Sequence, residues 1–202
     1  EADILPRMKG IQKFLYAQTQ LCITGCMPAV QALSAAGIPV MAMKGAARVL
    51  ADGRKARERL VRDLDVLVPF ARAAGAFEVL QAAGWTFKAA GAWQKDWHMM
   101  DAIAHHHAWS LSDGAVELDL HHFSNSLNRL VGDDDGLWQR SGEITWRGLA
   151  VRLPSPADAM ILSIVHGLRW SREHNADWII DACSCLDGAA IDWPLVIAES
   201  RR

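Results

Sequence analysis

The stretch RLVRDLDVLV, residues 59–68, decides the fold of this 202-residue chain. Its apolar residues predict a β-strand over 64–68. Because successive side chains of a strand point to opposite faces, Asp63 and Asp65 share one face and the apolar residues occupy the other. Two carboxylates side by side repel each other unless a cation lies between them. Divalent metal meets this need, since Mg²⁺ binds one or two carboxylates and completes its shell with water and substrate phosphates.

A second acidic strand follows as ELDLH, residues 117–121. Glu117, Asp119 and His121 share one face of it, so pairing beside the first strand would bring one of its acids to the first carboxylate pair. Three carboxylates can hold two metal ions about 3.5–4 Å apart, which suits in-line phosphoryl chemistry. The sequence does not set the strand register, so Asp119 and Glu117 both remain candidates for the third acid. His121 is a candidate to orient substrate or a metal-bound water.

A glycine turn precedes both acidic strands. The segment MKGAA, residues 43–47, is typical of the end of a strand, a turn and the start of a helix. Backbone N–H groups at such a turn can receive a phosphate, and Lys44 adds positive charge beside Gly45. Solvated acids on an edge strand, and a glycine needed only for the turn, are the plainer interpretations of these segments. The order of turn, acid pair and third acid favours the functional interpretation.

The rest of the pattern predicts an α+β domain with a helical C-terminal part. We divide the chain into an N-terminal helical segment (1–36), an α/β core (37–153) and a C-terminal helical part (154–202). The Asp113-Gly114 turn predicts a hairpin, and Ser155 predicts a helix N-cap. The expected strands are 38–43, 64–68, 85–88, 105–111, 115–122 and 148–153. The expected helices are 7–36 with a break near 25–28, 44–51, 71–83, 175–186, one that follows Ser155 and one that starts near 193, with a loop or frayed helix over 52–59.

Composition excludes several classes of protein. Lys+Arg 21 against Asp+Glu 23 gives a net charge of −2, which disfavours long nucleic acids and anionic membranes as partners. The chain has no apolar run of the roughly 18 residues that a membrane span needs. It opens without a secretion-signal pattern, so we expect a cytoplasmic protein. A zinc site would need C-x₂₋₄-C pairs at both ends of its ligand set, and Cys183/Cys185 fits that spacing poorly. The four cysteines are therefore expected to be buried free thiols.

Three of these segments together resemble the uncharacterised nucleotidyltransferase family of bacteria, a branch of the polymerase-β-like superfamily. They are the turn at 43–47, the arginine-flanked acid pair at 59–68 and the acidic strand at 117–121. The helical residues after 153 also resemble that family's tail, so the likeness covers about residues 30 to 200. The resemblance implies a small mixed β-sheet with flanking helices. One departure is that Lys44-Gly45-Ala46 stands where most of the superfamily carries Gly-Ser.

The resemblance also implies roles for individual residues. Asp63, Asp65 and Asp119 would be the catalytic metal ligands, holding Mg²⁺ or Mn²⁺. Lys44 and Gly45 take the place of the turn that contacts the phosphates of a nucleoside triphosphate, for which ATP is the expected choice. Arg59 and Arg62 either neutralise triphosphate charge or pair with the strand acids.

The leading hypothesis is a nucleotidyltransferase that moves a nucleoside monophosphate from the triphosphate to a hydroxyl or amine of an unknown acceptor. The acceptor is a small molecule, a peptide or a protein. The departure at Lys44 motivates an alternative, a catalytically silent nucleotidyltransferase-like module that binds a partner in the manner of an antitoxin. A third hypothesis is a metal-dependent hydrolase built on the histidines at 105–107 and on Asp119 and His121.

Overall fold

The computed structural model describes residues 4–88, 106–128, 130–168, 176–186 and 191–201. One mixed sheet runs through them, with seven strands in the order β3-β4-β5-β2-β1-β7-β6. The strands are β1 (Met41–Ala42), β2 (Asp63–Leu67), β3 (Thr86–Phe87), β4 (Ala108–Ser112), β5 (Glu117–His121), β6 (Gly142–Trp146) and β7 (Leu149–Leu153). The helices are α1 (Ile4–Gly25), α2 (Met27–Ala35), α3 (Lys44–Ala51), α4 (Ala73–Ala82), α6 (Asp135–Arg140), α7 (Pro156–Gly167), α8 (Asp177–Ser184) and α9 (Trp193–Glu199), with the 3₁₀ segments η1 (Gly53–Arg57) and η2 (Phe70–Arg72).

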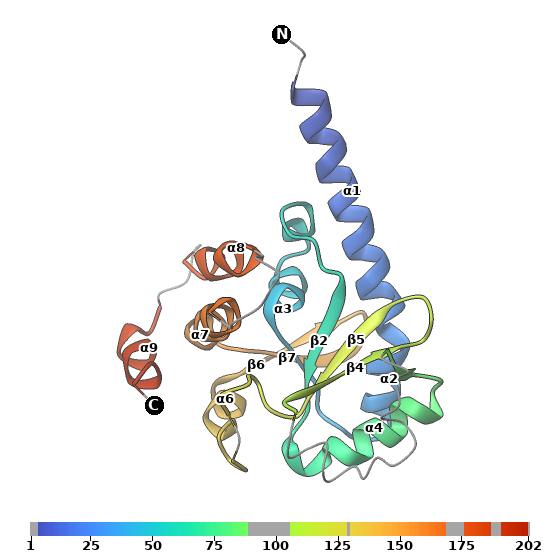
Figure 1. Ribbon diagram of the computed structural model, residues 1–202, viewed down its shortest axis with the longest axis vertical. Coiled ribbons are helices and arrows are strands. Elements are labelled where there is room, and N and C mark those ends of the chain that lie inside the picture. The colour runs from blue at the N-terminus through green and yellow to red at the C-terminus, as the bar shows by residue number, and fades with distance from the viewer. Residues whose placement is uncertain (1–3, 89–105, 129, 169–175, 187–190, 202) are drawn as a thin grey trace.

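The two faces of the sheet are covered differently. Helices α2 and α4 and the end of α1 pack on the apolar face, where residues such as Val30 and Leu80 join Leu64, Val66 and Leu118 in the main core. On the opposite face a smaller apolar cluster joins the sheet to α6 and α7. Figure 1 shows α3, α7 and α8 gathered beside β2 and β7, and α1 extending away from the body. The acid-bearing face of β2 is therefore flanked by helices.

The centre of the sheet combines parallel and antiparallel pairs. β2 pairs in parallel with β5, and antiparallel with β1 on its other side. β1 in turn pairs in parallel with β7. Since β2 and β5 run in the same direction, residues at the same level point to the same face. This pairing brings the two acidic strands together.

Most of the expected elements are confirmed, as is the α+β fold class. The first helix breaks between Gly25 and Met27, α3 spans 44–51 as expected, and the Ser155 Oγ accepts a hydrogen bond from the N–H of Asp158 at 3.2 Å. One strand is shorter than expected: the strand predicted over 38–43 is only Met41–Ala42. The segment 52–59, expected as a loop or frayed helix, contains the 3₁₀ segment η1. Strand β6 was not predicted, because its residues are mostly exposed or half-buried and lack strict apolar alternation.

The cysteines divide into two groups. Cys22 and Cys26 are buried free thiols, as expected, and packing in the main core raises the pKa of the Cys26 thiol through its Cys22 neighbour and through burial. The expectation of burial was wrong for Cys183, which is exposed, and for Cys185, which is half-buried. Both lie near the end of α8, a helix in which Asp181 is buried and most of the other described residues are exposed or half-buried. Among the described helices, none combines the length and apolar character that crossing a membrane requires.

Candidate active site

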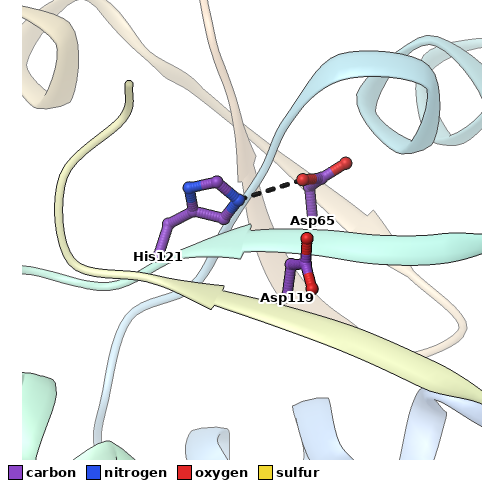
Figure 2. A group of neighbouring side chains, drawn as sticks. All are labelled: Asp65, Asp119 and His121. Atoms are coloured by element: carbon purple, nitrogen blue, oxygen red, sulfur yellow. Dashed lines mark hydrogen bonds and ion pairs between the residues drawn. The ribbon is translucent and has the colours of Figure 1, made fainter. Parts of the chain in front are cut away.

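The register of β2 and β5 decides which acids meet. Asp65 lies opposite Asp119, and Asp63 lies opposite Glu117. Oxygen atoms of Asp65 and Asp119 and a ring nitrogen of His121 all lie within 4.8 Å of one another. Figure 2 shows these three side chains converging above the two strands. The structure therefore brings together two of the three expected acids and the expected histidine.

Asp65 is the centre of this group and is buried, with 6% of its surface exposed. Its Oδ1 lies 2.5 Å from the Nζ of Lys44 and 3.0 Å from the Nε2 of His121. Burial alone would raise the pKa of the Asp65 carboxyl. The Lys44 ammonium and the hydrogen bond to His121 outweigh burial and hold that pKa below its usual range. Asp65 is therefore an ionised carboxylate whose charge is balanced by the side chains around it.

The other two members of the group are held by neutral partners. The Ser110 hydroxyl, on β4, donates to Asp119 Oδ1 at 2.6 Å and fixes that carboxylate. The second ring nitrogen of His121, Nδ1, lies 3.3 Å from the carbonyl oxygen of Phe123. In a metal-ligating histidine the ring nitrogen that faces away from the metal usually donates to a carbonyl or carboxylate, so Nδ1 beside the Phe123 carbonyl would leave Nε2 for a metal ion once the proton of its hydrogen bond to Asp65 is gone. Two carboxylates and one such imidazole fit a divalent cation.

Asp63 and Glu117 lie one pair further along the same face. Burial raises the pKa of Asp63 to about 6, and the negative charges of Asp65 and Asp119 add to the shift. Glu117 accepts a hydrogen bond from the Lys88 Nζ at 2.6 Å near the edge of the site. Asp119, opposite Asp65, is therefore better placed than Glu117 to be the third acid.

The turn at Lys44 carries backbone strain. Lys44 has a φ of 51°, a left-handed conformation that costs a non-glycine residue about 1–3 kcal/mol. It begins α3, whose first turn leaves backbone N–H groups without acceptors inside the helix. A Cβ on Gly45 would lie 3.1 Å from the Arg59 guanidinium, so the glycine permits that side chain to pack against the turn.

Arg59 and Arg62 lie in different surroundings. The Arg59 Nη1 lies 2.9 Å from Asp177 Oδ2, and its Nε lies 3.1 Å from Asp181 Oδ1. Arg59 also donates to the carbonyl of Leu60. It therefore joins the segment before β2 to α8, and its ion pairs are with α8 and not with the acids of β2. Arg62 is exposed.

A cavity of about 270 Å³ extends from Lys44 between α3, α7 and α8. Arg48 lines it, and only 10% of that side chain is exposed. Its Nη2 donates to Glu58 at 2.6 Å, whereas its Nε and Nη1 are buried without a hydrogen-bond partner among the described residues. Buried donors without acceptors are costly, and Arg48 therefore lines this cavity with hydrogen-bonding capacity that its described neighbours leave unused. Arg48 was not among the predicted site residues, although its spacing of four residues from Lys44 puts both cations on one helix face.

A larger cavity, of about 500 Å³, lies between α6, α7 and the loop after β5. Ser124 and Asn125 line both this cavity and a small pocket beside His121 and Lys44. The cavity therefore begins next to the candidate metal group. The charged residues among its described lining are mostly acidic: Asp133, Asp134, Asp158 and Glu199, with Arg140 as the one cation.

Only some of the histidines named in the hydrolase hypothesis lie at this site. His105 lies outside the described residues, and His106 is exposed. The rings of His107 and His121 have centroids 5.4 Å apart. Of the described histidines, His121 alone belongs to a group of three possible metal ligands.

Comparison with solved structures shows that this fold is that of the nucleotidyltransferases. The solution structure of the antibiotic-resistance factor ANT(2″)-Ia matches with a TM-score of 0.56 at 15% identity, covering 89% of this chain and 91% of that one. The crystal structure of an antigenic nucleotidyltransferase-like protein from Paracoccidioides brasiliensis matches with a TM-score of 0.51 at 19% identity, covering 86% and 78%. A crystal structure of ANT(2″)-Ia in complex with adenylyl-2″-tobramycin reaches 0.49 at 16% identity, covering 81% and 88%.

The family follows from the sequence itself. The chain belongs to the family described as uncharacterised nucleotidyltransferase, whose model matches residues 1–202. This confirms the family that the motifs indicated. No curated protein matches the sequence significantly.

Proposed function

We propose that the chain transfers a nucleoside monophosphate from a nucleoside triphosphate, with ATP as the expected donor, to a hydroxyl or amine of an acceptor, using Mg²⁺ or Mn²⁺. The observation that carries the proposal is the convergence of Asp65, Asp119 and His121 beside Lys44 at the start of α3. Enzymes that transfer phosphoryl groups act mainly by positioning and by charge neutralisation. The acids, the cations and the helix start supply both within one site.

Each group of residues at the site has its own role in this reaction. A divalent cation held by Asp65, Asp119 and His121, with Asp63 as a further ligand, would neutralise charge on the α-phosphate and lower the pKa of the acceptor. Lys44, Arg48 and the N–H groups at Gly45 hold the β- and γ-phosphates. Arg59 supports the nucleotide site through the Gly45 turn that it packs against.

The transfer itself is a single displacement at phosphorus. The acceptor oxygen or nitrogen forms a bond to the α-phosphorus, and the bond from that phosphorus to the oxygen bridging to the β-phosphate breaks. Pyrophosphate leaves with the electron pair of that bond. The proton of the acceptor passes to the carboxylate of Asp119, which lies next to Asp65 on the acid-bearing face of the sheet.

The acidic cavity next to His121 supports an acceptor that carries positive charge. Four carboxylates and one arginine line it among the described residues. Its volume of about 500 Å³ falls within the usual range for small-molecule sites. An amine-bearing, hydroxylated small molecule fits both the size and the charge of this cavity.

Labelled nucleotide tests the proposal. Incubation of the chain with [α-³²P]ATP, Mn²⁺ and a panel of amine-bearing sugars should label an acceptor, and N-acetylation of that acceptor should abolish the labelling. Asp65→Asn combined with Asp119→Asn should reduce transfer at least about 100-fold. Glu78→Gln, which neutralises an exposed acid on α4, should leave transfer unchanged.

Calorimetric titration separates the enzyme from the binding module. The wild-type chain should bind ATP in the presence of Mg²⁺, and the double variant at Asp65 and Asp119 should not. Absence of binding by the wild type, or equal binding by both, contradicts the proposal. Tight binding of a protein partner that survives the double substitution, without any nucleotidyl transfer, would favour the silent module.

A further inference from the structure

A cation supplied by the protein already lies at the candidate metal group. The Lys44 Nζ lies 2.5 Å from Asp65 Oδ1, the same oxygen that faces His121 Nε2 at 3.0 Å. The two side chains of this ion pair are 14% and 9% exposed. The ammonium and a bound metal ion would therefore use the same carboxylate.

Two cations at one carboxylate compete for it. Like charges a few ångströms apart repel strongly, and more so where burial limits screening by water. A divalent ion bound at Asp65 would face the Lys44 ammonium at such a distance. Binding of the ion through Asp65 therefore requires the ammonium to leave that oxygen.

The structure also offers a destination for the ammonium. Lys44 and Arg48 both line the 270 Å³ cavity. Lys44 also lines the small pocket beside His121. The four-carbon stem of a lysine lets its head group turn without movement of the backbone. An anion beside Arg48 would hold the ammonium away from Asp65.

We propose that Lys44 is the resident counter-ion of Asp65, and that divalent metal displaces it toward the Arg48 cavity, where phosphates then hold it. Metal and phosphate consequently favour the same position of Lys44. Each ligand should therefore strengthen binding of the other by the same factor. This inference rests on the proposed function only in taking the anion to be a phosphate. The exchange itself depends on Lys44, Asp65 and the metal ion.

Titration with Mn²⁺ alone, followed by the electron paramagnetic resonance signal of the free ion, tests the exchange. Lys44→Met should bind Mn²⁺ at least about tenfold more tightly than the wild type, because the competitor is gone. Lys44→Arg, which keeps the positive charge, should bind Mn²⁺ as weakly as the wild type does. Lys88→Met is the matched control, since Lys88 makes an equally direct ion pair with Glu117 on the same sheet face. Its effect should stay below about threefold, because that pair is more exposed.

Three outcomes of this titration overturn the proposal. They are Mn²⁺ binding by Lys44→Met that is no tighter than that of the wild type, equal tightening by Lys88→Met, and no binding by any variant. The result is independent of nucleotidyl transfer. If Lys44→Met tightens binding but the wild type transfers no nucleotide, the exchange stands and the proposed function fails. If the wild type transfers nucleotide but Lys44→Met does not bind Mn²⁺ more tightly, the proposed function stands and the exchange fails.

A measurement on the wild-type chain covers the case in which Lys44→Met does not fold. Amines are acylated faster when they are released from an ion pair, so saturating Mn²⁺ should accelerate acetic anhydride labelling of Lys44, read by mass spectrometry. Lys88 serves as the internal reference, and its labelling should not change. An unchanged ratio of Lys44 to Lys88 labelling in protein that has bound Mn²⁺ would show that the ammonium stays on Asp65.

Discussion

Asp63 and Asp65 are two positions apart on one strand and have opposite electrostatic properties. Asp65 is ionised because Lys44 and His121 contact it. For Asp63, burial and the acidic neighbours outweigh the attraction of Lys44 and raise its pKa to about 6. Strand alternation predicts that the two share a face, but the direction of each pKa shift depends on side chains from α3 and β5.

The raised pKa of Asp63 predicts a pH-dependent change in stability. The folded-state pKa of about 6 lies above the ordinary value of 3.8, so folding disfavours the ionised form. The contribution of this group is fully present below pH 3.8 and is lost as the pH rises through 6. In metal-free protein, Asp63→Asn should therefore raise the free energy of unfolding by about 2–3 kcal/mol at about pH 7.5. Urea denaturation in the presence of EDTA measures this.

The same variant provides its own control at low pH. Near the ordinary carboxyl pKa, at about pH 4, Asp63 is already protonated in the folded wild type. The difference in stability between Asp63→Asn and the wild type should therefore shrink to near zero. A stabilisation of equal size at both pH values would show that the amide fits the position better for reasons other than charge. A loss of stability at the higher pH would contradict the assigned direction of the pKa shift.

At the scale of elements, α7 and α8 meet through a glycine. A Cβ on Gly167 would overlap the indole ring of Trp178, so that ring packs directly on the α7 backbone. Gly167→Ala should therefore destabilise the fold by about 2–3 kcal/mol, because the ring cannot yield without moving α8. Gly75→Ala is the matched control on α4, where a Cβ would meet nothing within 4 Å.

The control should change stability in the opposite direction. Alanine has the higher helix propensity, so Gly75→Ala should stabilise the chain by up to about 1 kcal/mol. Thermal and urea unfolding of both variants measure the contrast. If Gly167→Ala is as stable as the wild type, the close packing of Trp178 on α7 is not a constraint on the fold.

Helix α8 is also tied to the start of β2 by a buried ion pair. Asp181 is 5% exposed, and it is paired with Arg59. Arg59→Met would leave this acid buried without that cation and should cost about 3 kcal/mol. Arg54→Met removes a comparable but exposed partner of Asp52 and should produce no measurable change. Equal unfolding midpoints for Arg59→Met and the wild type in urea would contradict the link between α8 and β2.

Local signals in the sequence predicted local structure well. The Asp113-Gly114 turn, the Ser155 cap and the start of α3 each depend on residues within a few positions, and all three form as expected. The register that pairs Asp65 with Asp119 could not be predicted, because it depends on contacts across the whole sheet. The partners of Arg59 lie on α8, more than a hundred residues away, so no local pattern could favour them over the nearby acids.

At the scale of the whole molecule, the first half of α1 lies apart from the folded body (Figure 1). Residues 4–14 are all exposed, and several of them are large and apolar: Ile4, Leu5, Met8, Ile11 and Phe14. The helix joins the body further along. The Thr19 Oγ1 donates to the carbonyl of Arg59 and accepts from the N–H of Val61, both at 3.0 Å. Stability contributed by α1 should therefore come from its second half.

A truncation and a point variant test this division of α1. Deletion of residues 1–14 should leave the melting temperature within about 2 °C of the full chain, since residues 4–14 are all exposed. Thr19→Val should lower it by about 2–6 °C, because the N–H of Val61 then stays buried without that acceptor. Calorimetric melting of both proteins measures this, and a larger effect of the truncation than of Thr19→Val would contradict the division.

The parallel pairing of β2 with β5 has a consequence for the order of folding. Asp65 and Asp119 stand 54 positions apart in the chain, and parallel neighbours can be joined only by a crossover that leaves one end of the sheet and returns to the other. Such non-local contacts form late, after the loop between them has closed. The hairpin of β4 and β5 can form early and alone, yet it carries only part of the metal group. Metal affinity should thus appear in refolding chains only when the central strand pair has closed, which makes a bound ion a reporter of that final step.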